Sequence, residues 1–164
     1  MRHAVLVLTL LVMGTQLTAC ATAGSSGVQR GESDSVVWEV VDIRQSLEDN
    51  GLRMRWRFAL VLKNTGAAPI DFERMEIASR RGGSGDIHGG MNSTAFARHL
   101  EPGAELRISR SESWGCPQCA PGSLSRFFSD GIIVSYTLRG HDTAGEGVRV
   151  PIAVRLNSSV GERQ

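Results

Sequence analysis

The residues best suited to chemistry in this sequence are Cys116 and Cys119, which form a Cys-Pro-Gln-Cys motif. Two thiols at this spacing can close a disulfide within one loop, exchange that disulfide with a partner, or give two thiolates to a metal ion. A zinc site would need further ligands, for which His88, His99 and His141 are available. A closed structural zinc site normally shows two ligand pairs, and only one pair is present here. We therefore expect a structural disulfide between Cys116 and Cys119, and no metal.

The motif resembles that of thioredoxin-like proteins, in which an aromatic residue precedes the cysteine pair and a helix N-terminus activates the first thiol. Here Gly115 separates Trp114 from Cys116, and the following Ala120-Pro121-Gly122 would interrupt a helix. No strand-helix-strand pattern surrounds the pair, so thiol-disulfide exchange remains the alternative to a structural bridge. Haem attachment is excluded, because residue 120 is Ala where that motif requires His.

Other candidate sites are weaker. Met91 with His88 and His99 would offer soft and imidazole ligands to copper, but scattered methionines and histidines are more often surface or core residues. The glycine-rich run 82–90 lacks the Lys-Ser/Thr ending of a phosphate-binding loop. His141-Asp142 falls in an expected hairpin turn without an evident nucleophile beside it. We expect no cofactor, no catalytic residue and no enzymatic activity.

The amino terminus indicates where the protein resides. Met1-Arg2-His3 gives a basic start, and the apolar run that follows is too short to span a bilayer as a helix. This run ends in Leu17-Thr18-Ala19-Cys20, which resembles the lipobox of bacterial lipoproteins. The resemblance implies cleavage before Cys20, a diacylglyceryl group on its sulfur, and further acylation, for example by palmitate, at the new amino terminus. Because Ala21 rather than Asp follows, it also implies the outer membrane, with the protein facing the periplasm.

The elements that must position these residues follow from the domain boundaries. We expect a signal peptide over 1–19, the lipidated cysteine and a flexible tether over 20–33, one folded domain over 34–157, and a tail over 158–164. The tether prediction rests on the small and polar residues that follow Cys20. Disulfides form and persist in the periplasm, which favours a bridge between the two remaining cysteines.

The folded part repeats with a period of two, which indicates strands with one buried face. The clearest strand covers 53–63, followed by another from Ile70 in which the phase slips near Glu73 and Arg74, as a β-bulge would cause. Two long strands around a turn at 140–147 predict a hairpin, and Pro151 in its second strand favours a sheet edge. Shorter strands are expected over 36–43 and 104–108, with one more within 87–100.

Six or seven strands without a convincing amphipathic helix predict an all-β antiparallel sandwich. The chain from about 34 to 157 also resembles the small immunoglobulin-like domains of bacterial exported proteins. The resemblance lies in the run Leu60-Val61-Leu62-Lys63-Asn64-Thr65-Gly66, then Pro69-Ile70, Pro102-Gly103 and a final hairpin. It implies an immunoglobulin-like β-sandwich of about seven strands and carries over no catalytic residue.

A row of cations is the candidate partner-binding surface. Arg53, Arg55 and Arg57 should share the outer face of one strand, with Arg107 beside them if its strand is the neighbour. Such a row could bind a carboxylate-rich protein or the phosphates of a glycolipid or anionic lipid. The simpler interpretation is a solvated face with Glu39 or Glu105 across it, and this one we favour.

The whole chain of 164 residues has a formal net charge of +1, so no global charge favours nucleic acid as a partner. We expect a non-enzymatic lipoprotein, attached to the membrane through its lipid, whose sandwich binds an envelope protein or glycolipid. The alternatives are a tethered thiol-disulfide or metal-handling protein that uses Cys116 and Cys119, and a purely structural envelope protein.

Overall fold

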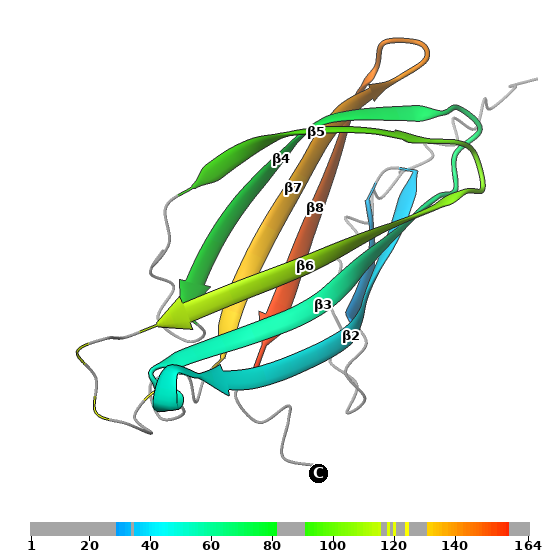
Figure 1. Ribbon diagram of the computed structural model, residues 1–164. Helices are drawn as coiled ribbons and strands as arrows, with labels where there is room; N and C mark the ends of the chain where they lie inside the picture. The colour runs from blue at the N-terminus through cyan, green and yellow to red at the C-terminus, as the bar shows by residue number, and fades with distance from the viewer. Residues whose placement is uncertain are drawn as a thin grey trace, which may run out of the picture.

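The computed structural model describes residues 29–33, 35–81, 91–115, 118, 120, 124 and 131–157. Within them the chain forms two four-stranded antiparallel sheets that pack face to face (Figure 1). Sheet A has the order β1-β2-β3-β6, with bounds Gln29–Ser33, Val36–Glu48, Arg53–Asn64 and Glu105–Gly115. Sheet B has the order β5-β4-β7-β8, with bounds Asn92–Leu100, Ile70–Arg81, Ile132–Asp142 and Gly147–Leu156. A short 3-10 turn, η1 (Asp49–Gly51), joins β2 to β3.

The order of strands confirms the predicted all-β immunoglobulin-like sandwich. Apart from β1, one sheet contains β2, β3 and β6, and the other contains β4, β5, β7 and β8. Lettered from β2, these are strands A, B and E in one sheet and strands C, C′, F and G in the other. This is the A-B-E and C′-C-F-G division of immunoglobulin-like domains. The added strand β1 lies outside β2 and brings the total among the described residues to eight.

The core lies between the sheets, where the alternating apolar residues of each strand meet. On β3 the residues that face inward are buried and those between them mostly face solvent, as the period of two predicts. The hairpin β7–β8 is present, with Ile132 opposite Leu156 and inward residues buried along both strands. The predicted bulge is also present: the register of β4 shifts between Phe72 and Arg74 against both neighbours.

Several strands are longer than the expected ones, or begin earlier. β1 falls inside the segment 20–33 expected to be a tether, so the sandwich starts at Gln29. This strand has no apolar alternation to reveal it, because it packs through Gly31, whose missing side chain leaves room for the Trp38 ring beside it. β6 continues past Ile108 to Gly115, since its inward positions include Arg110 and Glu112, which interrupt the apolar pattern.

The two sides of the sandwich differ in how their edges are closed. β8 is an edge strand, as Pro151 indicated, and β1 packs beside it. The side-chain amide of Gln29 donates to the carbonyl of Arg155 at 2.6 Å and accepts from its backbone N–H at 2.7 Å. Such pairing satisfies edge groups that could otherwise pair with another chain.

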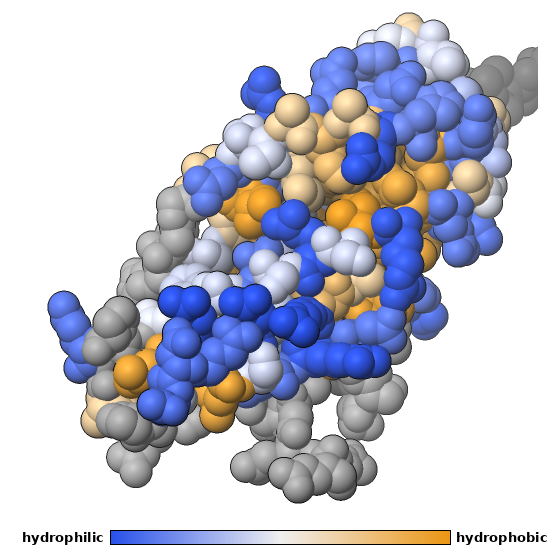
Figure 2. All heavy atoms as spheres, in the orientation of Figure 1, coloured by the Kyte–Doolittle hydropathy of each residue, from blue (hydrophilic) through white to orange (hydrophobic). Residues whose placement is uncertain are grey.

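On the opposite side, β5 and β6 are the unpaired edges, and apolar side chains reach the surface between them (Figure 2). Among them are Leu106 and Ile108 of β6, which pack on the core but are only partly buried. Within the described part of the chain, no helix has the length and apolarity needed to cross a membrane.

Candidate functional site

Four of the residues singled out from the sequence lie outside the described residues: Cys20, Cys116, Cys119 and His88. The lipid anchor, the disulfide and the alternatives built on the cysteine pair therefore stay predictions. β6 ends at Gly115, directly before this pair.

The predicted row of cations on β3 lies on the outer face of sheet A. Arg53, Arg55 and Arg57 alternate with the buried residues of β3, and Arg107 lies on the same face of the adjacent strand β6. Two of the three predicted residues are engaged by acids at the β2–β3 connection. Arg53 Nε lies 3.3 Å from Asp49, and Arg55 Nη2 lies 3.0 Å from Glu48. For Arg53 and Arg55 the arrangement is that of a charged, solvated face.

Arg57 differs from the other two. Its cross-strand partner in β2 is Arg44, and its partner in β6 is Ser111. Both arginines are exposed, and among the described residues neither forms an ion pair or side-chain hydrogen bond. Residues directly opposite in an antiparallel pair have Cβ atoms about 5 Å apart, and like charges placed there are destabilising. We call Arg44, Arg57 and Ser111 the arginine row.

A bulge in β2 brings Arg44 to this face. The register against β3 shifts between Val41 and Arg44, and Asp42 adopts a positive φ of 56°. Aspartate is among the residues that tolerate this conformation best. Without the one extra residue of this bulge, Arg44 would point inward, as Val36 and Val40 do. The bulge therefore turns a cation outward that simple alternation would bury.

Two of the histidines considered for metal binding lie on the outer face of sheet B. His99 on β5 and His141 on β7 both stand opposite Asp71 on β4, one on each side. His99 Nδ1 lies 2.7 Å from Asp71 Oδ1 and its Nε2 lies 3.1 Å from Glu101 Oε1. These contacts, first with Asp71 and then with Glu101, raise the pKa of His99.

The other imidazole is also held by neighbours. A hydrogen bond with the Asp142 carbonyl, followed by the charge of Glu73, raises the pKa of His141. Met91, the other suggested copper ligand among the described residues, is 74% exposed directly before β5. No group of three or more His, Cys, Asp or Glu side chains within the described ranges is placed to hold a metal ion.

A polar cluster lies inside the sandwich, between β6 and β7. The fully buried Tyr136 donates its hydroxyl to Glu112 Oε1 at 2.6 Å, and the same oxygen lies 3.2 Å from Arg110 Nη2. The Arg110 guanidinium also stacks over the Tyr136 ring at 5.3 Å. Burial, and next the Glu112 carboxylate, raise the pKa of Tyr136, so its hydroxyl stays protonated. The cluster is paired internally except at Arg110 Nε, which is buried without a hydrogen-bond partner among the described residues.

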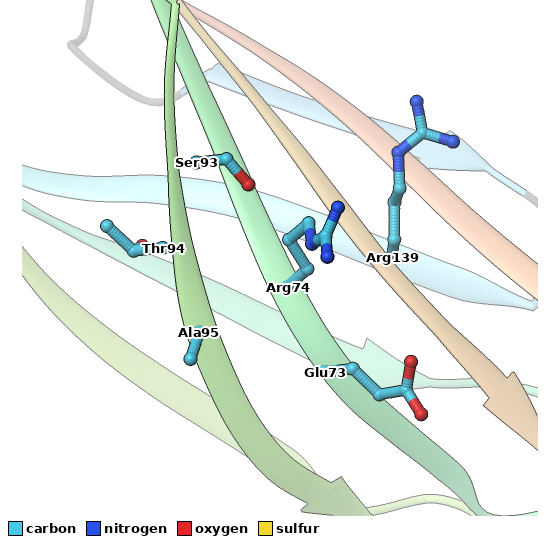
Figure 3. Close-up of a pocket in the computed structure, with 6 residues that line it drawn as sticks. All are labelled: Glu73, Arg74, Ser93, Thr94, Ala95 and Arg139. Carbon is cyan, nitrogen blue, oxygen red and sulfur yellow. The ribbon is translucent and has the colours of Figure 1, made fainter.

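A shallow hollow of about 560 Å³ lies on the outer face of sheet B at the β4 bulge (Figure 3). Small residues on the edge strand β5 form its low side, and long charged side chains rise from β4 and β7. The lining residues are Glu73, Arg74, Ser93, Thr94, Ala95 and Arg139. Figure 3 shows the Ser93 hydroxyl and the Arg74 guanidinium on the same side of the sheet, while the Thr94 side chain points away across β5. We call this feature the bulge pocket.

Sequence patterns could not single out Arg44, Arg74, Ser93 or Arg139. Their proximity depends on cross-strand register, which the turns and bulges set. The shift in the apolar alternation near Glu73 and Arg74 can be seen in the sequence. A similar interruption of the alternation after Val40 is the signal that could have revealed Arg44.

The fold and these surfaces define the chain as an immunoglobulin-like antiparallel sandwich with arginine pairs on both outer faces. No family model matches the sequence, and no curated protein gives a significant match.

Among the solved structures that are similar in fold, two match this chain over most of their own length. One is an X-ray structure of a Northeast Structural Genomics Consortium target, with 13% identity and a TM-score of 0.59 over 79% of this chain and 91% of that chain. The other is the crystal structure of the putative ApaA protein from Bordetella pertussis, with 14% identity and a TM-score of 0.57 over 76% of this chain and 94% of that chain. At this identity both support the fold alone.

Proposed function

We propose that this protein is a lipid-anchored lipoprotein of the bacterial outer membrane, without enzymatic activity, whose sandwich binds an anionic component of the envelope. The anchor is supported by the lipobox-like Leu17-Thr18-Ala19-Cys20 after a short apolar run. Several acyl chains on one residue give stable attachment, since each buried methylene contributes roughly 0.8 kcal/mol.

The arginine row is the observation that carries the binding function. Arg44 and Arg57 face each other without an acid, so a phosphate placed between them would accept charge-assisted hydrogen bonds from both. Ser111 adds a hydroxyl in the same cross-strand row. The ligand class that fits is the phosphate group of an anionic lipid or glycolipid at the membrane surface.

The position of the tether supports this choice of partner. Fully extended, the chain from Cys20 to Gln29 can reach about 30 Å at most, which keeps the domain close to its membrane. Gln29 lies opposite Val40, whose partner on β3 is Leu60. Arg57 is therefore about 10 Å away along the strand direction and two strand spacings, about 10 Å more, across the sheet. Lipid head groups are therefore held near the arginine row at high effective concentration.

The anchor is tested by the intact mass of the protein from the membrane fraction, before and after reduction and thiol alkylation. A diacylated or triacylated Cys20 supports the proposal, and an unmodified amino terminus contradicts it. The same spectra show whether Cys116 and Cys119 become alkylated only after reduction, as a structural disulfide requires.

The binding face is tested with the lipidated protein in nanodiscs of phosphatidylcholine, with or without phosphatidylglycerol. Phenylglyoxal modifies free guanidinium groups, and mass spectrometry locates the product. Modification of Arg57 and Arg44 should fall in the anionic discs and recover at high salt, while Arg53, already paired with Asp49, should change little. Equal modification of Arg57 in both kinds of disc would contradict the proposed face.

Matched variants on one strand complete this test. Arg57→Gln should remove the protection of Arg44 in anionic discs, because a single guanidinium holds a phosphate less well than two. Arg53→Gln removes the same charge from the same strand and face and should leave that protection intact.

A further inference from the structure

The bulge pocket lies on the face of the sandwich opposite to the arginine row. The register of β4 against β7 passes from Phe72 opposite Gly140 to Arg74 opposite Arg139, which leaves Glu73 as the extra residue. On the other side Arg74 stands opposite Ala95, whose single methyl group leaves the space above it open. The hollow therefore follows from the bulge and from a small residue on the edge strand.

The charges around the pocket are paired, with one exception. Arg139 Nε donates to Glu76 Oε1 at 2.7 Å, and Glu73 Oε1 lies 3.1 Å from His141 Nε2. Arg74 forms no hydrogen bond or ion pair among the described residues. The guanidinium of Arg74 is thus a cation without a paired acid among the described residues. Beside it lies the guanidinium of Arg139, which pairs with Glu76 through Nε.

We propose that the bulge pocket binds the carboxylate or phosphate group of a small soluble molecule. Arg74 offers a planar set of donors that matches either oxyanion, Arg139 presents its terminal nitrogens from the adjacent strand, and Ser93 adds a hydroxyl. The volume of about 560 Å³ lies within the range of small-molecule sites. This site is independent of the arginine row, since the two lie on opposite outer faces and share no residue.

Titration of the full-length mature protein in non-ionic detergent tests the site. Sodium phosphate, acetate and succinate are added at constant ionic strength, with chloride as the balancing anion, and the backbone amide and arginine Nε–H signals are followed by NMR. Saturable shifts are expected at Arg74, Arg139, Ser93 and Ala95, and any shifts at Arg44 and Arg57 report the separate arginine row. The phosphate arm and the two carboxylate arms show which oxyanion the pocket prefers.

Three variants make the result decisive. Arg74→Gln should weaken binding by about tenfold or more, because it removes charge-assisted hydrogen bonds. Ala95→Leu should also abolish binding, by filling the hollow while every charge is retained. Arg53→Gln removes a cation from the opposite face, at a residue already paired with Asp49, and should bind as the unaltered protein does.

Shifts that do not saturate, or that persist in Arg74→Gln and Ala95→Leu, would overturn the proposal. Because Arg74 and Ala95 are exposed, both variants should keep the dispersed spectrum of the folded domain. Shifts at Arg44 and Arg57 with none at the bulge pocket would place the anion on sheet A instead. Nanodisc footprinting at Arg57 is a separate measurement, so either proposal can fail without the other.

Discussion

Replacement of Asn64, a buried polar residue at the end of β3, should strongly destabilise the sandwich. Asn64 ends β3 and is the buried polar side chain of the described core, with no exposed surface. Its Nδ2 donates to the carbonyls of Ala68 at 2.8 Å and Leu100 at 3.0 Å, while its Oδ1 accepts from the N–H of Gly66 at 2.9 Å. Because Leu100 ends β5, this one amide joins the two sheets.

The loss can be estimated from these three bonds. Each contributes roughly 0.5–1.5 kcal/mol net, and a buried partner left unsatisfied adds its own desolvation penalty. Asn64→Ala should therefore lower the free energy of unfolding by about 3–5 kcal/mol, a large part of the 5–15 kcal/mol typical of a domain. For a domain of this size the midpoint of thermal unfolding would fall by roughly 10–20 °C.

Asn64→Asp keeps the shape but replaces the donor by a carboxylate that faces two carbonyl oxygens. Burial should raise the pKa of this new carboxyl above its unfolded value of about 3.9, so the variant should lose stability as the pH rises from 4 towards 7. Below that range the protonated acid can donate one hydrogen bond, and part of the stability should return.

Urea unfolding followed by tryptophan fluorescence measures each free energy, with Asn92→Ala as control because Asn92 is exposed on β5. The control should change stability by less than about 0.5 kcal/mol. A loss below about 1 kcal/mol for Asn64→Ala would refute the cross-sheet role of this side chain, as would Asn64→Asp with no dependence on pH.

Three further perturbations have definite expected outcomes. Gly140→Ala would place a Cβ against the carbonyl oxygen of Asp71, closer than a van der Waals contact allows. The free energy of unfolding, measured in urea, should fall by about 3 kcal/mol. A near-neutral result would contradict this close approach. The contacts of His99 raise its pKa, so its contribution to stability is full below the unfolded pKa and disappears as the pH rises through the folded pKa. His99→Gln should therefore be less stable than the unaltered protein at pH 5. Its free energy of unfolding should approach that of the unaltered protein at pH 9. Arg57→Glu should raise stability by roughly 0.2–1 kcal/mol, because it pairs Arg44, and should also remove the protection of Arg44 in anionic nanodiscs. Lower stability in this variant would show that the two arginines do not repel each other.

The fold was accessible from the sequence because its central strands bury one face each. The alternation along β3, β7 and β8 reports that burial directly, and the slip at Glu73 and Arg74 marked a real bulge. β1 could not be predicted, since its place depends on Gly31 against Trp38 and on Gln29 at the edge of β8, which are contacts between distant segments.

The candidate surfaces were less accessible than the fold. Arg53, Arg55 and Arg57 were correctly placed on one outer face, but the pattern could not distinguish the paired arginines from the unpaired one. That distinction depends on η1, which brings Asp49 next to Arg53, and on the bulge in β2, which turns Arg44 outward. A single residue of register reverses the face of every side chain that follows, and bulges are not encoded in a simple period.

The distribution of acids separates a solvated charged face from a binding face. Acids within reach of sheet A pair with Arg53, Arg55 and Arg107, while Arg44 and Arg57 stay opposite each other without one. A shortage of carboxylates does not explain this, because Asp and Glu number 17 against 18 Lys and Arg in the whole chain. An unpaired like-charge pair weakens the sheet that carries it. Such a pair is expected where an anion from outside the chain supplies the missing charge, and a membrane surface held close by a lipid tether offers anions of that kind.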